Sequence, residues 1–103
     1  MRKIYVKRKW SIIECASRIY LYVQCPAEYA THKFGDKSFA EYALKNGKTV
    51  AVDILDEQTE VIIESSTMQA TYTVPAGSGD VSLIAFPKFS PANGNPFTIK
   101  ENV

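Results

Sequence analysis

The sequence has a single histidine, only two cysteines, almost no net charge and no long apolar run, and each shortage excludes a class of protein. Without a stretch of about 18 apolar residues, we predict no membrane-spanning helix. A formal net charge of +1 gives no overall field that would attract nucleic acid or an acidic membrane. One histidine leaves little material for a catalytic or metal site built on imidazole.

The composition is that of one folded domain covering residues 1–103. Apolar residues make up 46% of the chain and charged residues 22%, which excludes a disordered protein. No targeting segment is evident, because the basic residues 7–9 interrupt the apolar stretch that a signal peptide needs after its charged start. We therefore expect a cytoplasmic location.

What the chain does have is a repeated alternation of apolar and polar residues. In residues 67–74 the side chains of Met68, Ala70, Tyr72 and Val74 would share one face, with polar side chains between them. This period of two predicts half-buried β-strands. We expect strands at 3–9 (Ile4 and Val6 inward), 10–15, 19–25, 49–55, 59–65, 67–74, 81–86 and 97–100, with loops at 26–37, 75–80 and 90–96.

The segment 38–46 carries two conflicting signals. Ser38 and Glu41 match a helix capping box, and Gly47 would suit a helix C-terminus. Asn46-Gly47, however, is a strong hairpin turn, and it would join a strand at 39–45 directly to the strand after it. We favour the hairpin, and likewise expect residues 56–58 to form the turn of a second hairpin.

Short connections favour antiparallel pairing, since parallel strands need long crossovers. We therefore predict an all-β fold, an antiparallel β-sandwich of immunoglobulin-like type, with seven or eight short strands and at most one short helix.

Three segments resemble small immunoglobulin-like domains of the PEGA type. They are the tyrosine-bearing strand 19–23, the Leu-Lys-Asn-Gly turn at 44–47, and the strand at 59–63. The match covers about half of the chain, and the sequence departs from the family pattern where Gln24-Cys25-Pro26 replaces an Asp-Gly turn. The resemblance implies an accessory or surface-binding module without shared catalytic residues.

The two cysteines are predicted to be free thiols. If residues 10–15 and 19–25 form a hairpin, Cys15 lies near its turn and Cys25 at its far end. That separation exceeds the ~6 Å between Cα atoms that a disulfide bridge allows.

Two groups of titratable residues invite a chemical reading. His32 lies near Glu28 and Asp36, but it lacks a defined set of metal ligands or a paired nucleophile, so we interpret it as an exposed loop residue. The acidic residues between 53 and 64 lack a calcium-loop pattern, and we interpret them as a solvated or cross-strand-paired face. We predict no catalytic residues, no metal and no cofactor.

The basic start of the chain is the opposite feature. Five of the twelve basic residues lie in 2–9, with Tyr5 and Trp10 near them, a pattern that also occurs in single-strand nucleic-acid binders. Lysines on an edge strand, however, commonly prevent aggregation. We expect this charge to lie close to the acidic segment 53–64, and we do not expect nucleic acid to be the partner.

The remaining candidates are aromatic. Tyr20 and Tyr22 point away from the expected core, and either they form a binding surface or the segment 26–37 covers them. We predict a non-enzymatic domain that binds a protein, or else a carbohydrate, through Tyr20, Tyr22, His32 and Phe34. The alternatives are a small enzyme with an unrecognised site and a single-stranded nucleic-acid binder.

Overall fold

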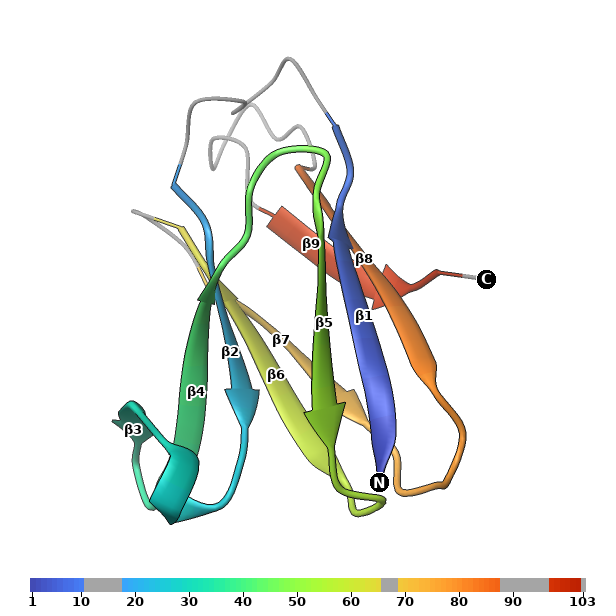
Figure 1. Ribbon diagram of the computed structural model, residues 1–103. Coiled ribbons are helices and arrows are strands. Elements are labelled where there is room, and N and C mark those ends of the chain that lie inside the picture. The colour runs from blue at the N-terminus through green and yellow to red at the C-terminus, as the bar shows by residue number, and fades with distance from the viewer. Residues whose placement is uncertain (11–17, 66–68, 88–96, 103) are drawn as a thin grey trace.

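The computed structural model describes residues 1–10, 18–65, 69–87 and 97–102, and in these ranges it contains nine strands in two facing sheets (Figure 1). One turn of 3-10 helix is the only other regular element of the described ranges, and no helix there is long or apolar enough to cross a membrane. The elements are β1 (Arg2–Arg8), β2 (Tyr20–Gln24), η1 (Ala27–Tyr29), β3 (His32–Phe34), β4 (Lys37–Ala43), β5 (Thr49–Ile54), β6 (Thr59–Glu64), β7 (Gln69–Val74), β8 (Val81–Pro87) and β9 (Phe97–Glu101).

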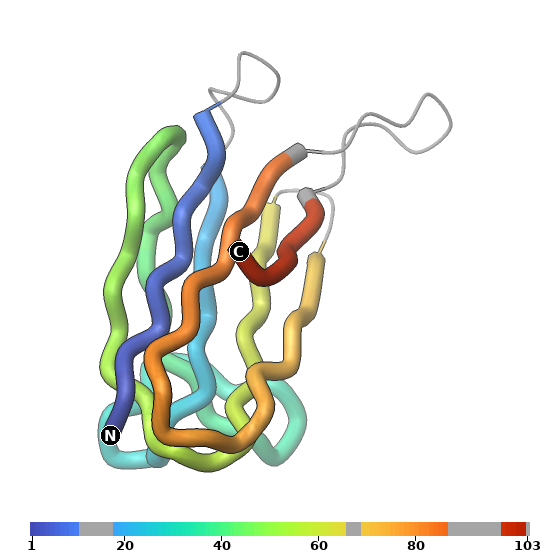
Figure 2. Tube along the Cα trace, turned by 90° about the vertical axis from the view of Figure 1, so that its right-hand side faces the viewer, coloured from blue at the N-terminus to red at the C-terminus, as the bar shows by residue number. Residues whose placement is uncertain are grey.

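The predicted all-β sandwich is confirmed, with a strand order that the short connections did not reveal. One sheet has the order β5-β1-β8-β9 and the other β3-β4-β2-β6-β7. Six of the seven neighbouring pairs are antiparallel, but β1 and β8 are parallel and lie side by side in Figure 2. The long stretch of chain between β1 and β8 supplies the crossover that parallel pairing needs.

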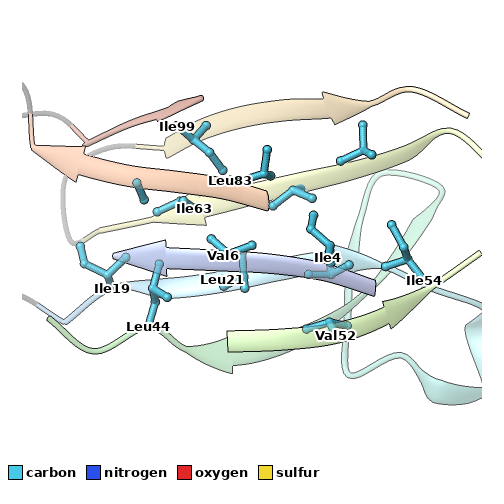
Figure 3. Packing of buried hydrophobic residues seen from close by; sticks show 14 residues of the cluster. Ile4, Val6, Ile19, Leu21, Leu44, Val52, Ile54, Ile63, Leu83 and Ile99 are labelled. Atoms are coloured by element: carbon cyan, nitrogen blue, oxygen red, sulfur yellow. The ribbon is translucent and has the colours of Figure 1, made fainter. Parts of the chain in front are cut away.

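Alternation places the core between the two sheets, as predicted. Ile4 and Val6 of β1 are fully buried and face Leu21 and Ile63 of the other sheet (Figure 3). The inward residues of β7 and β8, including Val74 and Leu83, join the same cluster. Full burial of one aliphatic side chain stabilises a fold by about 1.5–3 kcal/mol, so this cluster holds the two sheets together.

Both predicted hairpins are wrong, because each turn carries the chain from one sheet to the other. β4 lies in the five-stranded sheet and β5 in the four-stranded one, and β6 returns to the five-stranded sheet. Gly47 has the positive φ of 74° that its turn signal implied, but its N–H donates to the carbonyl of Arg8 on β1. The turn residues set the local bend, whereas the apolar faces of the flanking strands decide which sheet each strand joins. Segment 37–43 is a strand, so the helix alternative is also wrong.

The second crossover is fastened by a buried arginine. The Arg2 guanidinium donates hydrogen bonds to the carbonyl oxygens of Leu55 at 3.2 Å, Glu57 at 3.1 Å and Pro75 at 2.7 Å. Only 5% of Arg2 is exposed, so these charge-assisted bonds compensate the loss of hydration. They tie the β5–β6 crossover to the end of β7.

The expected loop at 26–37 is also corrected, since it holds η1 and β3 and brings the strand count to nine in the described ranges. β3 has only three residues, too short to show a period of two. The expected strand 10–15, the residues Cys15, Thr67 and Met68, and the expected loop at 90–96 lie wholly or largely outside the described residues. Cys25 is described, and it is a free thiol.

Candidate functional site

The four predicted binding residues lie together on the outer face of the five-stranded sheet. Tyr20 and Tyr22 come from β2, and β3 folds back so that His32 and Phe34 reach the same face. The Tyr22 ring centroid is 5.1 Å from those of His32 and Phe34, both in edge-to-face geometry. The sequence prediction therefore grouped residues that are neighbours in space.

These residues nevertheless form a small second core more than an open surface. Tyr22 is only 6% exposed, and it packs with the buried Phe39 and Ile62. Tyr20 and Phe34 are half-buried against that cluster, and only His32 of the four is exposed. Because β3 belongs to the segment 26–37, the reading in which this segment covers Tyr22 is the one that the structure supports.

The His32 ring is held by two neighbouring side chains, those of Glu41 and Thr31. Its Nε2 lies 3.1 Å from Oε2 of Glu41, and its Nδ1 lies 2.9 Å from the Thr31 hydroxyl. That hydroxyl oxygen accepts a hydrogen bond from the Glu41 N–H, which closes the group. In the described ranges, no three His, Cys, Asp or Glu side chains come close enough to hold a metal ion.

The acidic residues of the segment 53–64 are mostly paired with cations, in agreement with their interpretation as a solvated or cross-strand-paired face. Lys3 lies 3.5 Å from Asp53 across the β1–β5 pair, so the basic strand does contact the start of the acidic segment. Glu60, on the other sheet, pairs instead with Lys37 at 2.8 Å. The predicted proximity of the two charged segments is therefore confirmed for Asp53 and wrong for Glu60.

The basic first strand does not present all of its charge to solvent. Arg2 and Arg8 are 5% and 3% exposed, and both donate hydrogen bonds to backbone carbonyls. A smaller hollow of about 340 Å³ lies near Arg8 and is also lined by Arg18, Tyr20 and Lys45. This hollow places cations beside an aromatic ring.

A larger hollow, which the sequence analysis missed, opens between the sheets. We call it the inter-sheet cleft; it has a volume of about 680 Å³, and its walls include Cys25, Tyr29, Ala40, Tyr42, Val52 and Asp53. It lies where β4 and β5, in opposite sheets, run along the same side of the sandwich (Figure 1). The expected hairpin would have paired these two strands directly and left no gap between them.

The titratable groups of the cleft suit binding better than nucleophilic chemistry. Burial raises the pKa of the Cys25 thiol, so it stays protonated at neutral pH, whereas a nucleophilic cysteine needs a lowered pKa. Burial, followed by the nearby Cys25 and Asp53, also raises the pKa of Tyr42. His32 lies on the opposite face of the five-stranded sheet and provides no base here.

No protein-family model, curated protein or solved structure matches the chain. The resemblance to PEGA-type domains thus rests on its three sequence segments alone.

Proposed function

We propose that the chain is a non-enzymatic protein-binding domain whose partner occupies the inter-sheet cleft. The observation that carries this proposal is the cleft itself. Its volume of about 680 Å³ lies within the range of about 300–1,000 Å³ that is typical of ligand sites. The walls combine apolar side chains with polar groups such as the Tyr42 hydroxyl, the Asp53 carboxylate and the Cys25 thiol, and polar groups in such sites fix the orientation of what binds.

The cleft is a better binding site than the aromatic face predicted from the sequence. Residues that contribute most to binding are ones that a partner can contact, and Tyr22 is already covered by β3. Tyr29 is 70% exposed at the wall of the cleft and offers the large aromatic contact that protein partners use. A carbohydrate would find only this one exposed ring among the described residues that line the cleft.

The test is a selection of peptides from a random library displayed on phage, with matched variants of β4. Ala40→Arg places a long side chain in the cleft, whereas Ala43→Arg adds the same side chain to β4 outside the cleft. We expect selected peptides to bind wild type and Ala43→Arg alike, and to bind Ala40→Arg at least about tenfold more weakly. Circular dichroism checks that both variants are folded. An unenriched library, or equal binding to Ala40→Arg, would contradict the proposal.

A second candidate function, binding of single-stranded nucleic acid, is favoured by the hollow near Tyr20. Arg18 and Lys45 would contact phosphates while the Tyr20 ring stacks on a base. Fluorescence anisotropy with a labelled oligothymidine tests this. Binding at low salt, with a logarithmic salt slope that falls by about 0.7 in Lys45→Ala, would support it. No binding at low salt would remove this candidate.

A further inference from the structure

The outer edge of β5 has no strand beside it in the described part of the chain. β5 is the last strand of the order β5-β1-β8-β9 and pairs only with β1. Such an edge presents unpaired N–H and C=O groups and is a template for another strand. Natural edges are often blocked by lysine or proline, but β5 contains neither and has Asp53 as its only charge.

The register shows which backbone groups point outward. The Arg8 N–H donates to Lys48 and thus points toward the β5 side, whereas the Lys9 N–H donates to Ala85 on β8. Because bonding direction alternates along a strand, Arg2, Ile4 and Val6 bond toward β5, and their partners there are Ile54, Val52 and Val50. The residues between these partners therefore direct their N–H and C=O groups away from β1: Thr49, Ala51 and Asp53.

The side chains of β5 define what a neighbouring strand would place in the cleft. Val52 and Ile54 are buried toward the core, and Thr49, Ala51 and Asp53 are exposed on the outside. Residues opposite one another in a sheet point to the same side. In an added strand, the residues opposite Val52 and Ile54 would therefore enter the cleft, and those opposite Ala51 and Asp53 would face solvent.

The charged groups at this end of β5 also limit which segment can bind beside it. Asp53 and Glu57 line the cleft, and Asp56 lies near them at the end of β5. Lys3 lies 3.5 Å from Asp53, the terminal ammonium lies 3.5 Å from Asp56, and the Arg2 guanidinium, which is bonded to the Glu57 carbonyl oxygen, is the third cation at this end. Asp53 is the one carboxylate that lies on β5 itself, and its side chain is 61% exposed. A lysine or arginine opposite Asp53 would form a cross-strand ion pair with this exposed carboxylate.

From these observations we infer that an extended segment of a partner protein adds to the sheet as an antiparallel strand beside β5. The segment carries aliphatic residues at alternate positions, which fill the inter-sheet cleft, and a basic residue opposite Asp53. This inference rests on the proposed function and specifies how its partner binds. A second copy of the chain fits less well, because antiparallel self-pairing about Ala51 would place Asp53 opposite Thr49, which offers no cation.

A synthetic peptide tests the geometry. Acetyl-Val-Lys-Val-Thr-Ile-Thr-amide would place its lysine opposite Asp53 and its aliphatic residues opposite Ile54, Val52 and Val50. N-methylation of its lysine and first threonine removes N–H groups that would face β5. N-methylation of the second valine and the isoleucine, the matched control, removes N–H groups that would face solvent. We expect the first modification to weaken binding at least about tenfold and the second to have little effect.

The protein side uses Ala51→Pro, with Ala51→Val as its control. Proline removes only an outward N–H at this position, so the pairing with β1 is kept, and proline is tolerated on edge strands whose N–H faces solvent. We expect Ala51→Pro to lose peptide binding and Ala51→Val to retain it. In wild type, the peptide should slow hydrogen exchange of the Ala51 and Asp53 amides. Asp53→Asn should weaken binding about threefold, but only of peptides that contain the lysine.

The outcomes separate the two proposals. If the peptide binds and Ala40→Arg abolishes binding, but neither Ala51→Pro nor N-methylation matters, strand addition is wrong and the cleft proposal stands. If the control N-methylation is the harmful one, the antiparallel arrangement is wrong. If sedimentation shows a dimer of this chain that Ala51→Pro dissociates, the occupant is a second copy and the partner inference is overturned.

Discussion

Nη2 of Arg2 donates a 2.7 Å hydrogen bond to the carbonyl oxygen of Pro75, which is 73 positions away in the sequence. Together with its bonds to Leu55 and Glu57, this contact joins the end of β7 to the crossover between the sheets. The Arg2 guanidinium is thus bonded to backbone carbonyl groups of the protein itself.

Replacing Arg2 should destabilise the protein strongly. Removal of a buried charged donor leaves three carbonyl groups to find other partners, and we expect Arg2→Ala to lower the free energy of unfolding by about 2–3 kcal/mol. Urea denaturation measures this. Lys7→Ala, at an exposed position of the same strand, is the control and should change stability by less than about 0.5 kcal/mol. Similar midpoints for both variants would show that the three bonds contribute little.

Tyr22 and Tyr20 should differ in what their truncation does. Tyr22→Ala removes a ring enclosed by Phe34 and Phe39, and we expect a loss of about 3 kcal/mol in unfolding free energy. Tyr20→Ala, at a half-buried position, should lose less. Thermal and urea unfolding of the two variants test this order. Equal effects would mean that β3 does not cover Tyr22 in solution.

Stability should fall at alkaline pH. Burial raises the pKa of Cys25, Tyr22 and Tyr42 in the folded protein above their ordinary values. At neutral pH all three groups are protonated in both the folded and the unfolded state. Burial keeps them protonated in the folded state up to a higher pH than in the unfolded chain. As the pH rises past about 8.5, the unfolded chain ionises first and the advantage of the folded state is progressively lost. Urea midpoints between pH 7 and 10.5 measure the decline.

Single substitutions show which group causes the loss of stability at alkaline pH. Tyr42→Phe keeps the ring and removes one titration, so its stability should decline less steeply with pH than that of wild type. A Tyr42→Phe profile identical to wild type would contradict a raised pKa at Tyr42.

Gly47 should be intolerant of a side chain. It has a φ of 74°, and a Cβ there would lie 3.3 Å from Cδ1 of Trp10. We expect Gly47→Ala to destabilise the protein by about 1–2 kcal/mol, from backbone strain and displacement of the indole. Because Trp10 is the only tryptophan, its fluorescence reports the displacement directly. Gly35→Ala has a similar φ of 68° but open space around the Cβ, so it should show the strain without the fluorescence change.

The sequence predicted which segments are strands and which residues face inward better than it predicted which strands pair. The alternation of apolar and polar residues identified the inward residues of β1 and β7 correctly, because every second side chain of a strand points to the same face. It could not reveal that the turns at 46–47 and 56–58 change sheets, since a turn signal describes the bend and not the partner. That error concealed the cleft between β4 and β5.

The predicted binding residues show the same limit. Tyr20, Tyr22, His32 and Phe34 do lie on one face, but periodicity does not say whether an outward face is open. β3 has three residues and no pattern of its own, so the sequence offered coverage of Tyr22 by the segment 26–37 as one alternative but could not favour it over an open surface.

The position of β1 has a consequence for how the protein folds. Ile4 lies opposite Val52 on one side and Val81 on the other, so the central pairing of the four-stranded sheet joins the start of the chain to its last quarter. Contacts between such distant residues close large loops and slow folding. During synthesis, β1 has an unpaired edge until β8 leaves the ribosome. Unpaired strand edges in incompletely folded chains favour aggregation, so we expect the nascent chain to be prone to it in that interval.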